Sequence, residues 1–416
     1  MSETTNFFKP GKLSVVLDGS AGSSGKGILS SFLWQTQRKE HTKFAVATFM
    51  ENAAHTIIED DGVEHMYQCL NSIAHLKNQY EKIYVAPGSV FATKTFLGEV
   101  KALGLGPDKV GVHPLCSIVT GVDVGYEKGT NDFEGNTKAV QESDNLKIGS
   151  TLHGVGAARA RRMLRRHDAV VARDVPELAP YICNTDEEII DRLTNGQSGL
   201  LEIAQGYTLS LFSRFWPRTT SRNCTVGAGF DDAMIPVSFA GPLALNFRTY
   251  PIRVNSNKYL RKSDGKPLTI EEWEATPEAD RTIIVGDSGG LYDDQKELTW
   301  DDISTDAGHK VVECTTLTKL PRRVFTFSQD LLLDAVRHNA TGDDLYLSVN
   351  FMNYVDSDVA GKRSEAEVMT SKVKTWIKGN LLSHKVCTDI EKRGISVAGV
   401  IVGTGPKTFD KVLVDI

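Results

Sequence analysis

The chain has 416 residues, of which 40% are hydrophobic and 24% are charged. This length suits one large domain or two ordinary ones, and this composition excludes a largely disordered chain. With 47 basic and 53 acidic residues the net charge is -6, which argues against wholesale nucleic-acid binding. No apolar run approaches the roughly 20 residues of a membrane span, and the first residues lack the apolar core of a secretory signal. We therefore expect a cytoplasmic protein that binds neither nucleic acid nor membranes.

Apolar strands and helical stretches alternate along the chain. Leu13–Leu17 is a β-branched run typical of a buried parallel strand, and a Gly/Ser-rich turn and a helix over residues 25–34 should follow it. Phe44–Thr48 and Lys82–Ala86 are predicted as strands, and Phe91–Leu103 is predicted as an amphipathic helix. Further strands are expected at residues 169–172, 199–203, 344–349 and 395–402.

This alternation predicts the fold class. Strands that alternate with helices form a mostly parallel sheet with helices on both faces, so we expect an α/β protein. The chain shows no internal repeat and no linker rich in Pro or Ser, which favours a single elaborated domain over residues 1–416. The charged stretch 264–296 is expected to be a surface excursion.

The stretch from Gly19 to Gly27 joins the first expected strand to the first expected helix. Backbone N–H groups and the positive end of the helix dipole can hold phosphate oxygens there, and Lys26 would add a point charge. A standard Walker A motif needs Gly, four residues and then Gly-Lys-Ser/Thr. Here Ser20 replaces the first glycine and Gly27 replaces the metal-binding hydroxyl. We expect a phosphate loop of unusual type, and a flexible glycine turn is the alternative.

Further motifs occur in the order in which adenylosuccinate synthetases carry them, and the chain resembles that family over most of its length. Gly22–Gly27 is similar to the family's Gly-Asp-Glu-Gly-Lys-Gly loop. The other matching segments are Asn52–Thr56, Ile148–Gly156, Ala204–Gly206 with Pro217, Thr220 and Asn223, Arg253–Val254, Thr315–Arg323 and Gly403–Pro406. Each match alone is weak, but their common order makes chance implausible.

The resemblance implies a ligase that condenses a 6-oxopurine nucleotide with L-aspartate and consumes a nucleoside triphosphate. The purine O6 is phosphorylated first, and the aspartate amine then displaces phosphate to form a C–N bond. This chemistry needs a base for the N1 proton, stabilisation of charge at O6, a metal ion across the phosphates and cations for the aspartate carboxylates. Mg²⁺ is therefore expected.

The resemblance also assigns residues to roles by position. Ser23, Lys26 and His55 take catalytic positions, and His55 matches the histidine that contacts the transferring phosphoryl group; a histidine satisfied in a turn is the alternative. Ser23 and Ala54 take the positions of the metal ligands. The nucleotide- and phosphate-binding positions are Gly22, Ser24, Gly25, Gly27, Asn52, Ser150, Thr151, Arg165, Gln205, Thr220, Asn353, Gly403, Gly405 and Pro406. The aspartate-binding positions are Thr316, Thr318, Arg322 and Arg323.

Arg165 lies in a basic stretch, Arg161-Arg-Met-Leu-Arg-Arg166. It matches the arginine that the family donates across its dimer interface to the nucleotide monophosphate. The resemblance therefore implies a homodimer with shared active sites. A solvated helix face is the alternative for this stretch.

Ser23 stands where the family has its catalytic aspartate, which accepts the N1 proton and touches the magnesium. Serine is a poor base at neutral pH, so either the protein is inactive or its substrate differs. A purine with a 2-amino group would crowd a carboxylate there, whereas a hydroxyl would fit and accept a hydrogen bond. The loop also resembles that of the phage branch of the family, the N6-succino-2-amino-2'-deoxyadenylate synthases, which convert dGMP towards diaminopurine for phage DNA. dGMP is the expected nucleotide.

Two further departures concern the sugar and the triphosphate. Leu320 falls where the family has an arginine close to the ribose 2'-hydroxyl, and an apolar group there favours a deoxyribose. Asn353 replaces the aspartate with which the family reads the guanine of GTP. An amide can donate to adenine N1 and accept from the 6-amino group, so we expect ATP or dATP as co-substrate. Retention of GTP is the alternative.

Three hypotheses remain. The first is a ligase that joins L-aspartate to dGMP with ATP or dATP and Mg²⁺, in the host cytoplasm if the gene is carried by a phage. The second is an adenylosuccinate synthetase that acts on IMP with GTP, against which Ser23, Leu320 and Asn353 argue. The third is a catalytically dead nucleotide-binding protein, which the retained Lys26 and His55 oppose.

Overall fold

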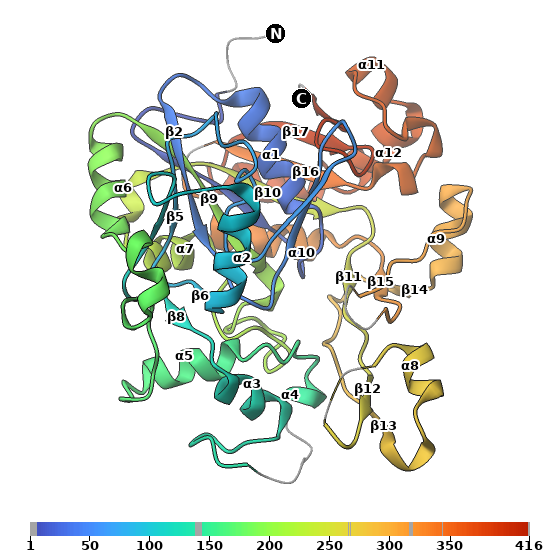
Figure 1. Cartoon of the computed structure of the whole chain (residues 1–416). Coiled ribbons are helices and arrows are strands. Elements are labelled where there is room, and N and C mark those ends of the chain that lie inside the picture. Colours follow the sequence, from blue (N-terminus) through green and yellow to red (C-terminus); the bar gives the residue numbers. More distant parts are fainter. Residues whose placement is uncertain are drawn as a thin grey trace.

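The computed structural model describes residues 6–137, 144–264, 266, 268–315, 319–342 and 344–414. A nine-stranded sheet forms the centre of this part of the chain (Figure 1). Its strands, from one edge to the other, are β18 (Lys411–Val414), β17 (Val397–Gly403), β16 (Leu345–Asn350), β10 (Ala240–Arg248), β1 (Leu13–Asp18), β9 (Ser198–Gly206), β2 (Thr42–Thr48), β5 (Lys82–Val85) and β7 (Val110–Val112). All neighbours are parallel except β17 and β18. The predicted α/β class is confirmed.

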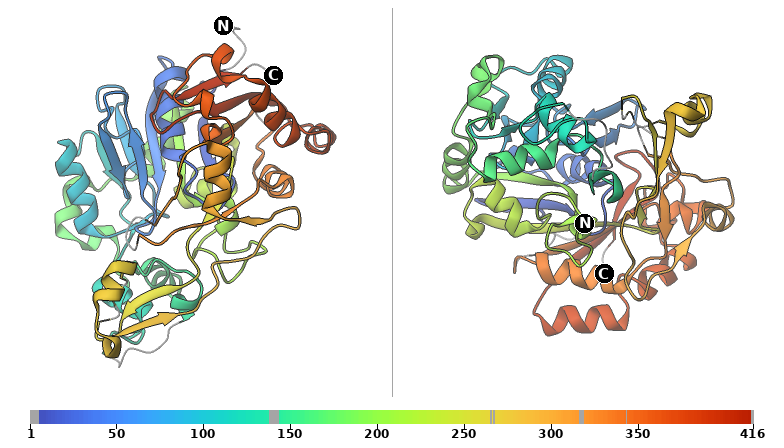
Figure 2. Two further views of the ribbon diagram at one scale, coloured as in Figure 1. Left: turned by 90° about the vertical axis from the view of Figure 1, so that its right-hand side faces the viewer. Right: turned by 90° about the horizontal axis from the view of Figure 1, so that it is seen from below.

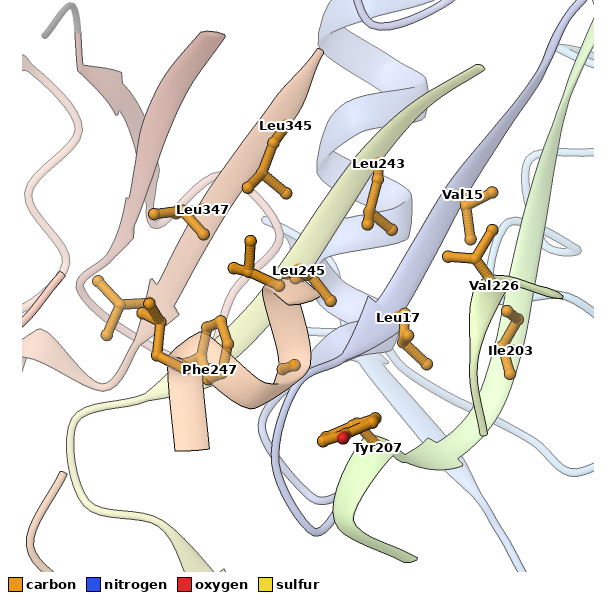
Figure 3. Packing of buried hydrophobic residues seen from close by; sticks show 14 of the residues in the cluster. Val15, Leu17, Ile203, Tyr207, Val226, Leu243, Leu245, Phe247, Leu345 and Leu347 are labelled. Atoms are coloured by element: carbon orange, nitrogen blue, oxygen red, sulfur yellow. The ribbon is translucent and has the colours of Figure 1, made fainter. Parts of the chain in front are cut away.

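The central strands β9, β1, β10 and β16 are buried along their whole length, because helices cover both faces of the sheet. Val15, Leu243 and Leu345 are register partners on three adjacent strands. Figure 3 shows this row of side chains on one face of the sheet. The next row on the same face contains Leu17, Leu245 and Leu347.

Two groups of helices cover the two faces of the sheet. The helices that pack on the face of Val15 are α6 (Thr185–Thr194), α7 (Val226–Ala233), α10 (Gln329–Asn339), α12 (Ser371–Gly379) and α13 (His384–Lys392). The helices that pack on the opposite face are α1 (Lys26–Gln37) and α2 (Thr93–Leu103). The remaining α-helices are α3 (Gly121–Lys128), α4 (Asp144–Lys147), α5 (Val155–Met163), α8 (Ile270–Ala275), α9 (Trp300–Ala307) and α11 (Glu365–Val368).

Short strands form smaller sheets around the centre. These are the hairpin of β3 (His55–Ile58) and β4 (Glu64–Tyr67), the pair β6 (Val90–Phe91) and β8 (Ser117–Ile118), the pair β12 (Lys258–Arg261) and β13 (Arg281–Ile284), and the three strands β11 (Ile252–Arg253), β15 (Arg323–Phe325) and β14 (Glu297–Leu298). The single-domain boundary over 1–416 and the surface excursion at 264–296 stay predictions.

The sequence prediction missed one central strand and placed one strand wrongly. β10 lies beside β1, but it contains Pro242, which normally argues against a central strand. The register of the two strands shifts between Leu13 and Val15, and this irregularity accommodates the proline. The strand predicted at 169–172 is wrong: Val171 makes only an isolated bridge to Ser117, and a 3₁₀ turn begins at Ala172.

Two excursions of the chain lie side by side beyond one end of the sheet (Figure 2). One contains α3, α4 and α5, and the other contains β12, α8 and β13. They meet where the Asp287 N–H donates to the Lys147 carbonyl at 2.8 Å and where Leu152 packs on Leu260. Among the described helices, none has both the length and the apolar character that crossing a lipid bilayer requires.

Candidate active site

The loop between β1 and α1 is fixed by buried polar side chains. Asp18 ends β1, and its carboxylate accepts the Ser20 N–H at 2.7 Å and the Ser20 hydroxyl at 2.8 Å. The Ser24 hydroxyl donates to the other oxygen of the same carboxylate. From the neighbouring strand β10, the Asn246 amide donates to the Ser24 carbonyl at 2.9 Å. These hydrogen bonds tie the loop to the end of β1 and to β10.

Glycines let other segments close on this loop. Gly22 and Gly25 adopt left-handed φ angles of 84° and 82°, and Gly25 is the N-cap of α1. A Cβ at Gly206 would collide with the carbonyl of Ser20, so the end of β9 packs directly on the loop. The first N–H groups of α1 have no partner within the helix, and the positive end of its dipole lies here. This arrangement supports the predicted phosphate-binding role of the loop.

Lys26 begins α1, and its amine is buried rather than solvated. The residue is 6% exposed, and Nζ donates to the carbonyl of Ile203 and, at 3.0 Å, to the carbonyl of Gln205. Burial lowers the pKa of Lys26, although the carboxylates of Glu202 and Asp18 act in the opposite direction. The lysine thus connects the phosphate loop to the end of β9.

His55, the first residue of β3, lies against the same end of β9. Its Nδ1 is 2.7 Å from Oε1 of Glu202, a carboxylate that is fully buried. Ser72 also binds Glu202, through its hydroxyl at 2.8 Å and its N–H at 3.1 Å. The ring of Phe49 packs edge to face on the imidazole, with ring centroids 4.2 Å apart. The structure therefore brings Lys26 and His55, both predicted as catalytic, onto one strand end.

These groups shift one another's ionisation. Burial and the cation of Lys26 lower the pKa of His55, against the opposing effect of Glu202. Burial alone would raise the pKa of Glu202, but His55 and Lys26 outweigh it, and the pKa of Glu202 is lowered. At neutral pH the set consists of an ionised glutamate and a neutral imidazole.

The contacts of Gly27 explain why the loop departs from the Walker A pattern. A Cβ at this position would lie 2.8 Å from Oγ of Ser72 and 3.2 Å from Cβ of His55. Real Cβ atoms essentially never approach another heavy atom as closely as this 2.8 Å contact with Ser72. A serine or threonine is therefore disfavoured here, because Ser72 and His55 would have to shift to admit it.

Three predicted nucleotide-binding residues from separate segments meet in one hydrogen-bonded group. Gln205 has a left-handed φ of 67°, and its Nε2 donates to Oδ1 of Asn52 and to Oγ1 of Thr220, each at 2.8 Å. Gln205 accepts from Lys26 through its own carbonyl and lies on β9 beyond Glu202, which holds His55. The group therefore adjoins the catalytic residues.

Three other predicted nucleotide-binding residues lie on the excursion that contains α5. Ser150 and Thr151 precede this helix, and Thr151 is exposed. Arg165 follows the helix, has a left-handed φ of 53° and is exposed. Within the described ranges, the side chain of Gln205 bonds to Asn52 and Thr220 and to none of these three residues. The single chain therefore leaves Arg165 outside the catalytic group.

The segment predicted to bind aspartate is described only in part, because Thr316 and Thr318 lie outside the described residues. Arg323 is engaged: it pairs with Glu297 at 2.7 Å and donates to the Gly289 carbonyl at 2.8 Å. Arg322 donates through Nε to the Cys314 carbonyl at 3.3 Å. Its two terminal nitrogens make no hydrogen bond to a described residue, so Arg322 is the better candidate for a carboxylate ligand.

Leu320, expected beside the sugar, is 2% exposed in this structure. Its N–H donates to Oγ1 of Thr315 at 3.1 Å, and the Thr315 N–H donates to its carbonyl. The side chain is therefore packed into the protein, and its role in choosing a deoxyribose stays a prediction.

The residues predicted around the triphosphate base lie at the ends of β16 and β17. Asn353 is in a 3₁₀ turn after β16, and its Oδ1 is buried without a hydrogen-bond partner in the described residues. A Cβ at Gly403 would collide with the side chain of Asn350, so only glycine fits there. The other two positions, Gly405 and Pro406, follow the same strand.

Two buried basic residues that the sequence prediction missed hold this region. Lys411 donates to Oδ1 of Asn350, whose amide in turn donates to the Ser24 carbonyl at 2.6 Å. Arg248 is fully buried, donates to the Ser23 carbonyl at 2.9 Å and forms an ion pair with Glu313. Arg248 thereby connects the phosphate loop to the start of the segment predicted to bind aspartate. A charged residue at the end of an apolar strand run was the signal for both.

Comparisons with known proteins agree with this geometry. No family model matches the chain. The chain is 30% identical over 351 residues to the N6-succino-2-amino-2'-deoxyadenylate synthase of Vibrio phage phiVC8. The aligned region covers 82% of this chain and 86% of that protein. It is also 27% identical over 262 residues to the adenylosuccinate synthetase of Archaeoglobus fulgidus. That aligned region covers 62% of this chain and 72% of that protein.

A solved structure is similar over nearly the whole chain. It is the succinoaminodeoxyadenylate synthetase of cyanophage S-2L, bound to dGMP and to dATP as an energy donor. The TM-score is 0.68 at 26% sequence identity, and the match covers 97% of this chain and 95% of that chain.

Proposed function

Because the chain belongs to the family of the N6-succino-2-amino-2'-deoxyadenylate synthases, we propose that it condenses dGMP with L-aspartate at the expense of ATP or dATP. The product is N6-succino-2-amino-2'-deoxyadenylate, a precursor of diaminopurine in DNA. One observation carries the choice of nucleotide: Ser23, at an exposed position of the phosphate loop, offers a hydroxyl and no carboxylate. An adenylosuccinate synthetase that acts on IMP with GTP is the alternative.

The reaction has two chemical steps. In the first, O6 of the purine attacks the γ-phosphorus, the bond between the β- and γ-phosphates breaks, and the N1 proton leaves. In the second, the amine of aspartate attacks C6, phosphate departs with the O6 oxygen, and the amine loses a proton. Lys26 and the N–H groups that begin α1 would stabilise the phosphate charge, and His55 would contact the transferring group.

A magnesium ion suits the donors that this loop offers. Mg²⁺ prefers oxygen ligands, keeps several waters and binds mainly through substrate phosphates. Ser23 has an exposed hydroxyl, and Ala54 contributes a backbone carbonyl one residue before His55. Within the described part of the chain no group of three or more His, Cys, Asp or Glu side chains could hold an ion by itself. When bound, the ion would neutralise charge on the phosphates.

The choice between ATP or dATP and GTP rests on Asn353. Its Oδ1 is buried and lacks a hydrogen-bond partner among the described residues, which is costly unless a ligand supplies a donor. The 6-amino group of adenine is such a donor, and the Asn353 amide nitrogen can donate to adenine N1, whereas guanine N1 carries a hydrogen and cannot accept. We therefore propose that ATP or dATP binds with its base at Asn353.

The remaining partners follow from the arginines. Arg322, whose terminal nitrogens make no hydrogen bond to the described residues, is proposed to bind a carboxylate of aspartate. Arg165, exposed and away from Gln205, is proposed to reach the monophosphate in a neighbouring subunit of a homodimer with shared sites. Because nucleotides and aspartate are cytoplasmic metabolites, we propose that the enzyme acts in the cytoplasm, which cell fractionation would check.

Incubation with aspartate, ATP and each of dGMP, GMP, IMP and dIMP tests the proposal. We expect the succinyl adduct of dGMP by mass spectrometry and poor reaction of IMP. Equal or faster turnover of IMP would refute the assignment. The variant Ser23→Asp should lose activity with dGMP. Ser23→Asn introduces a side chain of the same size without the charge, so a comparison of the two variants separates the effect of crowding from that of charge. Both aspartate and asparagine tolerate a left-handed φ such as the 54° of Ser23.

A further inference from the structure

Arg248 ends β10 and is fully buried, yet it has no role in the reaction proposed above. A guanidinium in such a place is costly unless it is paired. From its contacts we infer that Arg248 and Glu313 are positioning residues for the reaction. Their ion pair holds the phosphate loop at Ser23 against the segment that carries Arg322, and it thereby couples the binding of the nucleotide to that of aspartate. The assignment of these two segments to the two substrates rests on the proposed function, whereas the tie between them does not.

One end of this arrangement is the phosphate loop. Nη1 of Arg248 donates to the carbonyl of Ser23 at 2.9 Å, across 225 positions of the sequence. Ser23 has a left-handed φ of 54°, a conformation that residues other than glycine rarely adopt. Such a conformation persists only where surrounding contacts hold it. The bond from Arg248 is one of these contacts, so its loss should let the backbone of Ser23 relax.

The second partner of Arg248 is the carboxylate of Glu313. Both carboxylate oxygens accept from the guanidinium: Nη1 is 3.1 Å from Oε2, and Nη2 donates to Oε1. Such a two-pronged pair fixes the direction of both side chains. The Tyr354 hydroxyl donates to Oε1 at 3.2 Å, and the centroid of the Phe351 ring lies 4.2 Å from Cζ of Arg248. Neighbouring aromatic side chains therefore hold the pair as well.

Glu313 in turn holds Arg322. The Arg322 N–H donates to the Glu313 carbonyl at 2.9 Å, and the Nε of Arg322 donates to the neighbouring carbonyl of Cys314 at 3.3 Å. Cys314 and Pro321 form an antiparallel bridge between the same two stretches. Hydrogen bonds therefore lead without a gap from the phosphate loop through Arg248 and Glu313 to Arg322. A contiguous chain of this kind can carry coupling between two sites.

Stability is a poor explanation for this ion pair. A buried ion pair contributes little net stability, because both groups lose their water when they are buried. Among the described residues, Nε of Arg248 is also buried without a hydrogen-bond partner, which costs further free energy. Both observations favour a positioning role over a stabilising one.

Calorimetric titrations of the whole enzyme test the coupling. dGMP is titrated without and with saturating aspartate, and aspartate is titrated without and with saturating dGMP. A non-hydrolysable ATP analogue is present in each titration, so that no turnover occurs. In the wild type we expect each substrate to raise the affinity of the other by the same coupling factor, about 5-fold or more. Equal affinities with and without the other substrate would overturn the inference.

Variants separate positioning from stability. Glu313→Gln keeps the size of the side chain but removes its charge, so the coupling factor should fall towards one while the affinity for either substrate alone stays close to that of the wild type. A merely structural role would instead lower the separate affinities or the unfolding temperature and leave the factor unchanged. Arg248→Lys keeps the charge but lacks the fork that reaches both partners, so it should retain only part of the factor. Glu188→Gln on α6 is the matched control and should leave the factor unchanged, because this carboxylate likewise pairs with a basic side chain, Lys82, and accepts from a tyrosine hydroxyl, that of Tyr84.

The outcomes distinguish this inference from the proposed function. If Glu313→Gln does not fold, Tyr354→Phe removes one hydrogen bond from the same carboxylate and should lose a smaller part of the coupling factor; no loss there would overturn the inference. If the enzyme prefers IMP, the titrations use IMP, and the proposed nucleotide is wrong but the coupling is unaffected. A folded Glu313→Gln with the coupling factor of the wild type would refute the positioning role, even where turnover of dGMP is normal.

Discussion

Two parts of the active site differ in how completely one chain builds them. The phosphoryl region, defined by Lys26, His55, Glu202 and the loop of residues 18–25, is bonded from several strands, and Lys26, His55 and Glu202 are buried. The recognition region, defined by residues 150–165 and 313–323, contains exposed side chains, among them Thr151 and Arg165. The groups proposed to act on the transferred phosphate are thus held by buried contacts, whereas Arg165, proposed to bind the nucleotide, stands exposed in this chain.

The difference has a physical basis. Stabilising a phosphoryl group that moves by a few ångströms requires fixed dipoles and cations, which a parallel sheet provides at the ends of its strands. Binding a large substrate requires entry, so some of its ligands must stand open until it arrives. The comparison predicts that substitutions in the phosphoryl region reduce turnover and that substitutions in the recognition region alter KM or specificity.

The strongest challenge to this comparison is His55→Ala. Removing a positioned acid–base or charge-stabilising group should reduce kcat by roughly 10²–10⁴-fold and leave nucleotide binding largely intact. Steady-state rates and a binding titration with dGMP measure the two effects. Lost binding with unchanged turnover at saturation would show instead that His55 is a ground-state ligand.

Asn353→Asp tests whether specificity can be changed apart from turnover. We expect preference to move from ATP or dATP towards GTP by about 1–3 kcal/mol, because a carboxylate accepts from guanine and leaves adenine poorly paired. Initial rates with the three triphosphates measure it. Asn380→Asp, at the end of α12 and away from the site, is the control. A strict GTP requirement in the wild type would contradict the prediction.

Arg165→Leu probes the open side of the site. A lost charge-assisted contact to phosphate should raise the KM for dGMP about 10-fold or more, with an unchanged unfolding transition because the side chain is exposed. Arg173→Leu, another exposed arginine, should behave as the wild type.

Mixing the Arg165→Leu and His55→Ala proteins shows whether sites are shared between subunits. Heterodimers should regain one working site, because one subunit supplies the histidine and the other the arginine. A monomer by light scattering, or no recovery on mixing, would return Arg165 to a solvated surface role.

The smallest expected effect concerns Lys411. Burial lowers the pKa of Lys411 to about 7, well below the ordinary value of a lysine, against the opposing effect of Asp410. Above pH 7 the folded state holds a neutral amine while the unfolded state stays protonated, so stability should rise with pH. The rise from pH 7 to pH 8 is about 1 kcal/mol from this group. Denaturant titrations should show it reduced in Lys411→Met and retained in Lys378→Met, an exposed control.

Sequence reasoning located the residues that have an unusual neighbourhood in the chain. Lys26 lies among glycines after an apolar strand, and His55 and Gln205 lie in short motifs. It missed Glu202 and Arg248, because their partners Ser72 and Glu313 are far away in the sequence. A charged residue inside an otherwise apolar run was nevertheless a usable signal, since such a group must be paired when the strand is buried.

The same limit applies to the fold. Strands with continuous apolar runs, such as β1 and β2, were predicted to within a few residues. β10 was missed because local chemistry at Pro242 argues against a strand, whereas the pairing with β1 and β16 overrides it. The strand predicted at 169–172 failed for the opposite reason. The composition of this segment suits a strand, but Val171 pairs with the rest of the protein only through an isolated bridge to Ser117.

The contacts of Gly27 also constrain how this loop could have arisen from, or be converted to, a standard nucleotide-binding loop. A side chain at position 27 would crowd Oγ of Ser72 and Cβ of His55, so Gly27→Ser requires these two residues to shift. A directed-evolution library that varies position 27 alone should therefore return mainly glycine, and other residues should appear more often when positions 55 and 72 vary with it.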